Sequence, residues 1–73
     1  MSRNEWFKQL IADLRAVRQA RGISQNELGD KIGCTETLVG KWEMGRRSPT
    51  AFMLQCWCDA LGVELRVEKK EPQ

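Results

Sequence analysis

Apolar residues along most of the chain follow the period of an α-helix, and a glycine separates each periodic stretch from the next. In the first stretch they recur at steps of three and four, which places them on one helical face: Phe7, Leu10, Ile11, Leu14 and Val17. Glycine readily adopts the left-handed conformation that ends a helix, and glycines follow the successive stretches: Gly22, Gly33, Gly45 and Gly62. The pattern predicts helices over about residues 3–20, 25–32, 36–44 and 51–61.

The predicted helices begin at residues that satisfy the open amides of a first helical turn. Residues 2–5 and 24–27 both fit the capping box, in which a serine hydroxyl and a glutamate carboxylate bond reciprocally to backbone amides. Thr35 and Thr50 are the predicted N-caps of the third and fourth helices. The predicted N-caps and the glycines that end the helices therefore indicate the same four helices.

After the fourth helix the pattern changes to strict alternation. Val63, Leu65 and Val67 alternate with charged residues, so their side chains share one side of an extended strand over about residues 63–68. One strand in a helical chain lacks a partner for its backbone donors and acceptors. We expect it to pair antiparallel with the same strand of a second copy across a two-fold axis. The alternative is that it packs back on its own helices or frays; residues 69–73 are expected to form a flexible tail.

Length and composition favour one small domain, residues 1–68. A chain of 73 residues buries only about 60% of its unfolded surface, which leaves no room for a second core. The three cysteines lack C-x-x-C spacing and histidine is absent, so reduced thiols, no disulfide framework and no metal or cofactor are expected. No apolar stretch is long enough to span a membrane, and the charged N-terminus is unlike a signal peptide. We therefore expect a cytoplasmic location.

The distribution of charge is more informative than the net charge of +2. Between residues 15 and 47 lie seven basic residues and four acidic ones, so the middle of the chain is its basic part. An enzyme is not expected, because the chain has no histidine, no clustered carboxylate pair, no phosphate-cradling glycine loop and no nucleophile beside a base.

Two short predicted helices flank a tight turn at Gly33, and each has its own N-cap. This is the pattern of a helix-turn-helix, which sets its second helix in the DNA major groove. The stretch SQNELGDKIGCTETLVGKWEMGRRSP, with Arg18 before it, closely resembles the Cro/lambda-repressor-like (XRE) family over about residues 10–63. The resemblance implies an all-α, four-helix lambda-repressor-like domain that binds double-stranded DNA.

The third predicted helix is the expected recognition helix. Glu36 and Thr37 in its first turn, and Lys41 one turn further on, are the expected base-contacting residues. Lys41 suits guanine O6 or N7, Thr37 suits a hydrogen bond or a thymine methyl, and Glu36 suits cytosine N4. The alternative for Glu36 is that it only complements the positive end of the helix dipole.

Phosphate contacts are expected beside the recognition helix. Gln25 and Thr35 stand at the starts of the second and third helices, and Arg46 and Arg47 follow the third. The alternative is that Gln25 and the arginines are ordinary solvated residues.

Further expectations concern the support of the recognition helix. Arg18 and Glu43 occupy positions that form a partly buried ion pair in similar proteins. Trp42 is expected in the core rather than as a stacking platform. Gly40 interrupts the helix at a cost of about 1 kcal/mol relative to alanine, either because DNA or another segment approaches closely there or as a tolerated defect.

A second expected surface lies on the fourth helix. Phe52, Met53 and Cys56 fall where similar proteins have polar residues, and the three are neighbours on one helical face. An exposed apolar stripe of this kind marks a contact surface. With the C-terminal strand, which resembles that of HipB-like antitoxins, they form the predicted homodimer interface.

The sequence thus predicts a homodimeric repressor that reads a palindromic operator through the major groove. One alternative is an antitoxin that represses its own operon and neutralises a partner toxin. Another is a protein-interaction module that kept the fold but does not bind DNA. Glu36 and the modest net charge favour this alternative. Neither the operator sequence nor the choice between repression and activation follows from the residues.

Overall fold

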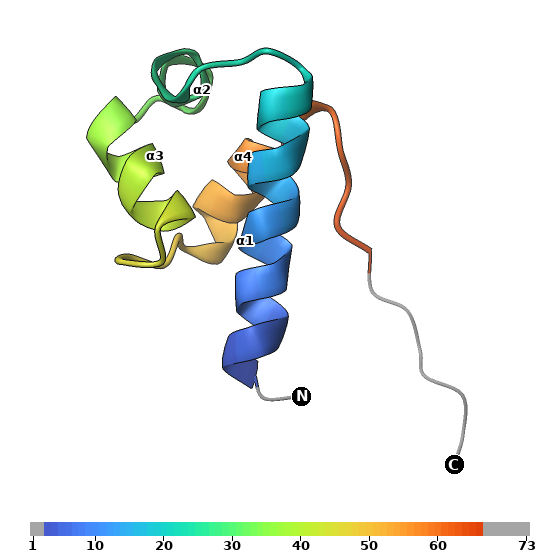
Figure 1. Ribbon diagram of the computed structural model, residues 1–73. Coiled ribbons are helices and arrows are strands. Elements are labelled where there is room, and N and C mark those ends of the chain that lie inside the picture. The colour runs from blue at the N-terminus through green and yellow to red at the C-terminus, as the bar shows by residue number, and fades with distance from the viewer. Residues whose placement is uncertain (1–2, 67–73) are drawn as a thin grey trace.

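The computed structural model describes residues 3–66, which form a bundle of short helices (Figure 1). The helices are α1 (Arg3–Ala20), α2 (Gln25–Ile32), α3 (Glu36–Glu43) and α4 (Ala51–Leu61). The predicted all-α fold with four helices is confirmed. The third helix ends one residue earlier than predicted, because Met44 is its C-cap rather than its last helical residue. None of the described helices is long and apolar enough to cross a membrane.

Local hydrogen bonds explain where α2, α3 and α4 begin. The Ser24 hydroxyl accepts from the Glu27 amide at 3.0 Å while the Ser24 amide donates to the Glu27 carboxylate at 3.0 Å, so the second predicted capping box is confirmed. The hydrogen bond that the Ser24 backbone amide donates to the carboxylate, and in second place the nearby Ser24 hydroxyl, hold the pKa of the Glu27 carboxyl below its ordinary value. Thr35 and Thr50 each accept an amide of the following turn, as expected. The first box involves Ser2, which lies outside the described residues.

The turn between α2 and α3 is tight enough to require glycine at two positions. Gly33 has a φ of +88°, the left-handed region that side chains disfavour. The amides of Gly33 and Cys34 both donate to the Gly29 carbonyl, at 2.7 and 2.8 Å. A Cβ added at Gly29 would lie 2.7 Å from the Cys34 carbonyl oxygen, closer than real contacts allow. Glycine at position 29 therefore lets α2 pack closely against the start of α3.

One apolar core holds all four helices together. Its buried members come from every helix: Ile11, Leu14, Leu28, Val39, Trp42, Trp57, Cys58 and Leu61. Trp42 of α3 and Trp57 of α4 stack with their ring centres 5.4 Å apart. Trp42 is 2% exposed, which confirms that it belongs to the core. Full burial of such a side chain stabilises the fold by about 2 kcal/mol, so the pair fixes α3 firmly on α4.

The chain after α4 leaves the bundle. Val63 donates its amide to the Cys58 carbonyl at 3.0 Å and packs partly against the core, whereas Leu65 is half-exposed. Within residues 63–66 no strand is formed, unlike the expected strand over 63–68. The physical reason is that a strand needs a second strand for its backbone hydrogen bonds, and the helices of a single chain offer none. Val67, the end of that segment and the tail 69–73 lie outside the described residues.

Candidate nucleic-acid interface

Helix α3, the expected recognition helix, has one buried and one exposed side. Val39 and Trp42 are buried in the core. The three residues expected to contact bases, Glu36, Thr37 and Lys41, are all exposed. Thr37 and Lys41 are four residues apart and therefore share a face of the helix. The structure thus leaves these side chains accessible to a partner while the opposite side anchors the helix.

Met44, which the sequence reasoning did not single out, extends this surface. It is 65% exposed and follows Thr37 by seven residues, two helical turns along the same face. The signal was present in the spacing, but the residue lies at the end of the helix, where the face turns into a loop. A large apolar side chain at that point suits contact with sugars or with a thymine methyl.

The residues expected at phosphates surround α3 at both ends. Thr35 caps the helix, and its hydroxyl accepts the Leu38 amide at 3.2 Å. Arg46 and Arg47 are exposed in the loop after α3, and their amides both donate to the Lys41 carbonyl, at 2.9 and 3.3 Å. The backbone of this loop is thereby tied to the last turn of α3, which keeps both arginines close to the end of the helix.

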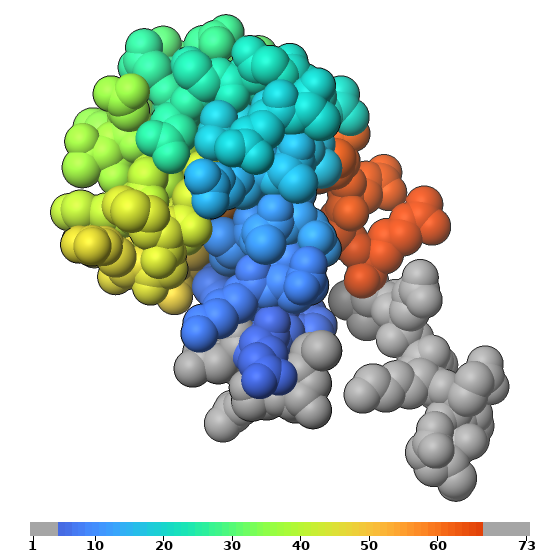
Figure 2. All heavy atoms as spheres, in the orientation of Figure 1, coloured from blue at the N-terminus to red at the C-terminus, as the bar shows by residue number. Residues whose placement is uncertain are grey.

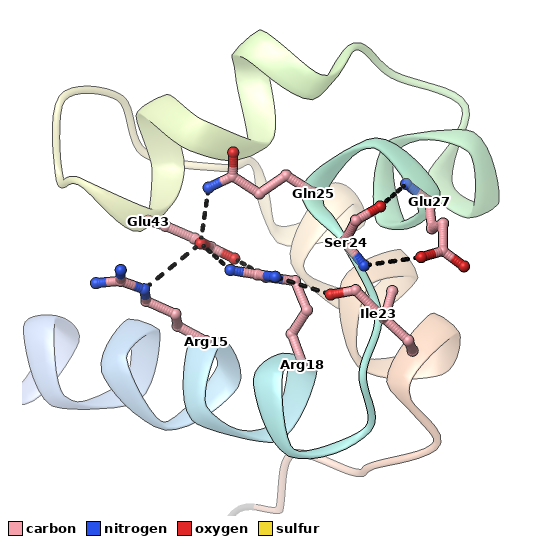
Figure 3. Close-up of polar contacts among 7 residues, drawn as sticks. All are labelled: Arg15, Arg18, Ile23, Ser24, Gln25, Glu27 and Glu43. Carbon is pink, nitrogen blue, oxygen red and sulfur yellow. Dashed lines mark hydrogen bonds and ion pairs between the residues drawn. The ribbon is translucent and has the colours of Figure 1, made fainter.

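Gln25 is placed differently from a solvated glutamine. It is the first residue of α2 and half-buried, and its Nε2 donates to Oε1 of Glu43 at 3.1 Å. Its amide also lies against Gly40, where an added Cβ would meet Gln25 Oε1 at 3.5 Å. That distance is an ordinary van der Waals contact, so the protein itself has room for a methyl group at Gly40. The side chain is thus held between α2 and α3 (Figure 3).

Arg18 and Glu43 are brought together in a two-pronged ion pair below this surface (Figure 3). Arg18 Nε donates to Glu43 Oε2 at 2.6 Å and Arg18 Nη2 donates to Oε1 at 2.9 Å. The side chains are 10% and 2% exposed. Arg18 Nη1 also donates to the Ile23 carbonyl at 2.8 Å, in the segment between α1 and α2. The pair therefore joins α1, the start of α2 and the end of α3 in one network.

Arg15 completes the surroundings of Glu43 and was missed by the sequence reasoning. Its Nε lies 3.8 Å from Glu43 Oε1, and its side chain is 55% exposed. The signal was its position three residues before Arg18, which puts both arginines on one face of α1. Because the Glu43 charge is buried among these partners, the accessible charges near the end of α3 are mainly positive: Arg15, Lys41, Arg46 and Arg47. Such a surface attracts polyanions.

The residues expected at a dimer interface differ in accessibility. Phe52 is 74% exposed, Cys56 is half-buried, and Met53 packs partly against the core. The apolar stripe expected on α4 is thus open only in part. Val63 is half-buried and Leu65 exposed, while Val67 lies outside the described residues.

Cysteines and acidic residues build no metal centre in the described residues. No group of three or more side chains there has the geometry to hold a metal ion. Burial raises the pKa of the Cys34 and Cys58 thiols, which disfavours the reactive thiolate. The candidate site is therefore the surface of α3 and its flanks.

Comparison with known proteins addresses this geometry directly. A helix-turn-helix family model, HTH_3, matches residues 14–67. The matched region contains the whole of α2, the turn, α3 and α4, together with the end of α1 that carries Arg15 and Arg18. No curated protein and no solved structure matches the chain. The family model covers well over half of the sequence, and it agrees with the observed pair of short helices around a tight turn. The chain belongs to the HTH_3 family of Cro/lambda-repressor-like helix-turn-helix domains, which bind DNA.

Proposed function

We propose that this protein is a sequence-specific transcriptional regulator that represses by occupying an operator in double-stranded DNA. The observation that carries the proposal is the rigid mounting of α3. Its inner side stacks on α4 through Trp42, and its end is fixed by Glu43, while Glu36, Thr37 and Lys41 stay exposed. A helix held in this way presents the same side chains to every DNA site, which sequence discrimination requires.

Base reading and backbone binding fall to different residues in this proposal. Thr37 and Lys41 read base edges, and Glu36 accepts from cytosine N4 or else only complements the helix dipole. The cap at Thr35, the start of α2 at Gln25 and the arginines after α3 hold the phosphates. These contacts set position and affinity but carry no base information.

We further propose that the regulator works as a homodimer on a palindromic site. Phe52 on α4 is 74% exposed, and a groove of about 370 Å³, which Phe52 does not line, lies between α4 and residues 63–65. Apolar Leu54, Cys58 and Val63 line this groove together with polar Gln55, Asp59 and Glu64, which suits a surface of a second copy that carries both kinds of side chain. Antiparallel pairing of the predicted strand with its counterpart in a second copy would supply the backbone hydrogen bonds that a strand requires. Two recognition helices would then stand about 34 Å apart, one helical turn of DNA.

The same apolar surface would also serve a partner toxin, the arrangement of an antitoxin that controls its own operon. Size-exclusion chromatography with light scattering separates the two cases for the isolated protein. A dimer at micromolar concentration that Phe52→Ser converts to a monomer supports self-association. A monomeric wild type would show that the surface serves another protein.

Selection from a random double-stranded DNA library tests the function. The proposal predicts a palindromic consensus, bound roughly a thousandfold or more tightly than scrambled DNA in fluorescence anisotropy at physiological salt. An affinity that falls steeply with salt but is equal for both DNAs would leave only nonspecific attraction. Absence of binding at low salt would contradict the proposal and favour a protein-interaction module, for which the exposed Glu36 on α3 and the exposed Met44 that caps it would be the first surface to examine.

A further inference from the structure

A groove of about 790 Å³ lies between α1 and the loop that follows α3. In the space-filling view the loop lies beside the surface of α1 (Figure 2). The charged residues that line the groove are three cations and one carboxylate: Lys8, Arg15, Arg47 and Glu43. The groove therefore extends the cationic surface of α3 onto α1, a helix to which the proposed function assigns no DNA contact.

The single carboxylate on this lining does not neutralise the cations. Glu43 is 2% exposed, and both of its oxygens already accept from Arg18, at 2.6 and 2.9 Å. Arg15 approaches Glu43 only through Nε, at 3.8 Å, beyond hydrogen-bond distance. Its two terminal nitrogens point away from Glu43 (Figure 3). A guanidinium group in this state keeps most of its donors for an outside anion.

The position of Arg15 shows which anion it would meet. Arg15 Nε and Gln25 Nε2 approach the same atom, Oε1 of Glu43, at 3.8 and 3.1 Å, so these side chains are neighbours across the gap between α1 and α2. On its other side Arg15 shares the groove with Arg47. It thus lies between the two flanks expected to hold phosphates, the start of α2 and the loop after α3.

We propose that Arg15 contacts a DNA phosphate between the phosphates expected at Gln25 and at Arg47, and that the buried Glu43 carboxylate lies behind its guanidinium group. This inference rests on the proposed DNA-binding function and adds α1 to the contacting surface. Arginine suits the role because its planar fork donates two hydrogen bonds to one phosphate. The contact carries no base preference.

The test is the salt dependence of DNA affinity for Arg15→Gln, with Lys31→Gln as the matched control. Both changes remove one positive charge from an exposed position, but Lys31 lies at the far end of α2. Arg15→Gln is expected to weaken binding roughly fivefold to tenfold, the loss of one hydrogen-bonded contact. The slope of log affinity against log salt should become shallower by about 0.9 per chain. Lys31→Gln should change the affinity less than about twofold, since it removes no contact and acts only through screened charge.

Further measurements distinguish the outcomes. Arg15→Lys should restore most of the salt slope because it restores the charge, and Arg15→Gln should weaken operator and scrambled DNA by the same factor. The melting temperature of Arg15→Gln should stay near that of wild type, because the half-exposed Arg15 lies 3.8 Å from Glu43, and both Glu43 oxygens keep their hydrogen bonds to Arg18. If wild type binds DNA but Arg15→Gln and Lys31→Gln show the same slope of log affinity against log salt, this inference is overturned and the proposed function stands. Failure of the wild type to bind any DNA would overturn both.

Discussion

The carboxylate of Glu43 is the group whose loss we expect to damage the fold most, so Glu43→Gln is the most informative single change. The substitution keeps the size of the side chain and removes its charge. It leaves the Arg18 guanidinium, 10% exposed, without a counter-charge, and it removes one acceptor from a network that also involves Gln25 and Arg15. Breaking a buried pair from one side in this way costs about 3 kcal/mol or more.

This cost should be readily visible in a thermal melt. In a domain of this size, 1 kcal/mol shifts the melting temperature by roughly 4–8 °C. Glu43→Gln is therefore expected to lower the melting temperature by about 12 °C or more, followed by circular dichroism. A melting temperature within about one degree of wild type would refute the idea that the pair holds α1 to α3.

An exposed ion pair in the same chain supplies the control. Arg66 Nε lies 3.4 Å from Glu64 Oε2, and these side chains are 77% and 76% exposed. Glu64→Gln removes the same charge from a solvated pair and should cost less than about 0.5 kcal/mol. Replacing Arg18 and Glu43 together by methionine and leucine should recover part of the loss, because no unpaired charge then remains. An equal effect of both single glutamine variants would show that burial is not the cause.

Two other expectations concern glycines and pH. Gly40→Ala should stabilise the protein by about 0.5–1 kcal/mol, because the nearest atom to the new methyl would be 3.5 Å away. Gly29→Ala should destabilise it by about 1–3 kcal/mol, because its methyl would meet a backbone oxygen at 2.7 Å. Urea denaturation gives the change in the free energy of unfolding for each variant, and changes of the same sign would contradict the packing described at these two glycines. The pKa of Glu27 is lowered in the folded protein, so the ionised carboxylate contributes to the free energy of unfolding at neutral pH. This contribution is lost as the pH falls through the lowered pKa. Wild type should therefore lose its advantage over Glu27→Gln in acid, and a pH-independent difference in urea midpoint would refute this.

Elements whose ends depend on local chemistry could be predicted from the sequence. The bounds of α2 follow from a serine cap and a left-handed glycine, and both act within a few residues of the helix end. The end of α3 was placed one residue too late, since the shift from helix to loop at Met44 depends on how the loop packs. The predicted strand is not formed in residues 63–66, because a strand needs a second strand for its backbone hydrogen bonds and a local pattern of residues does not supply one.

The exposure of the candidate residues was predictable from the sequence, but the hydrogen-bond network beneath them was not. Helical spacing was enough to separate exposed Thr37 and Lys41 from buried Trp42. That Gln25 donates to Glu43, and that Arg15 approaches the same oxygen, follows only from the crossing of α1, α2 and α3 in space. Side-chain contacts between residues so far apart in the sequence are fixed by packing, which the pattern of one chain does not encode locally.

The central claim is that the exposed face of α3 reads base sequence, and the ratio of affinities for selected and scrambled DNA tests it most directly. This ratio should be measured at one physiological salt concentration for wild type, Lys41→Ala and the control Lys31→Ala. We predict a ratio of roughly a thousand or more for wild type and the control, and a loss of about 1–3 kcal/mol of that discrimination for Lys41→Ala. A wild-type ratio near one, or a ratio that Lys41→Ala leaves unchanged, would contradict the account.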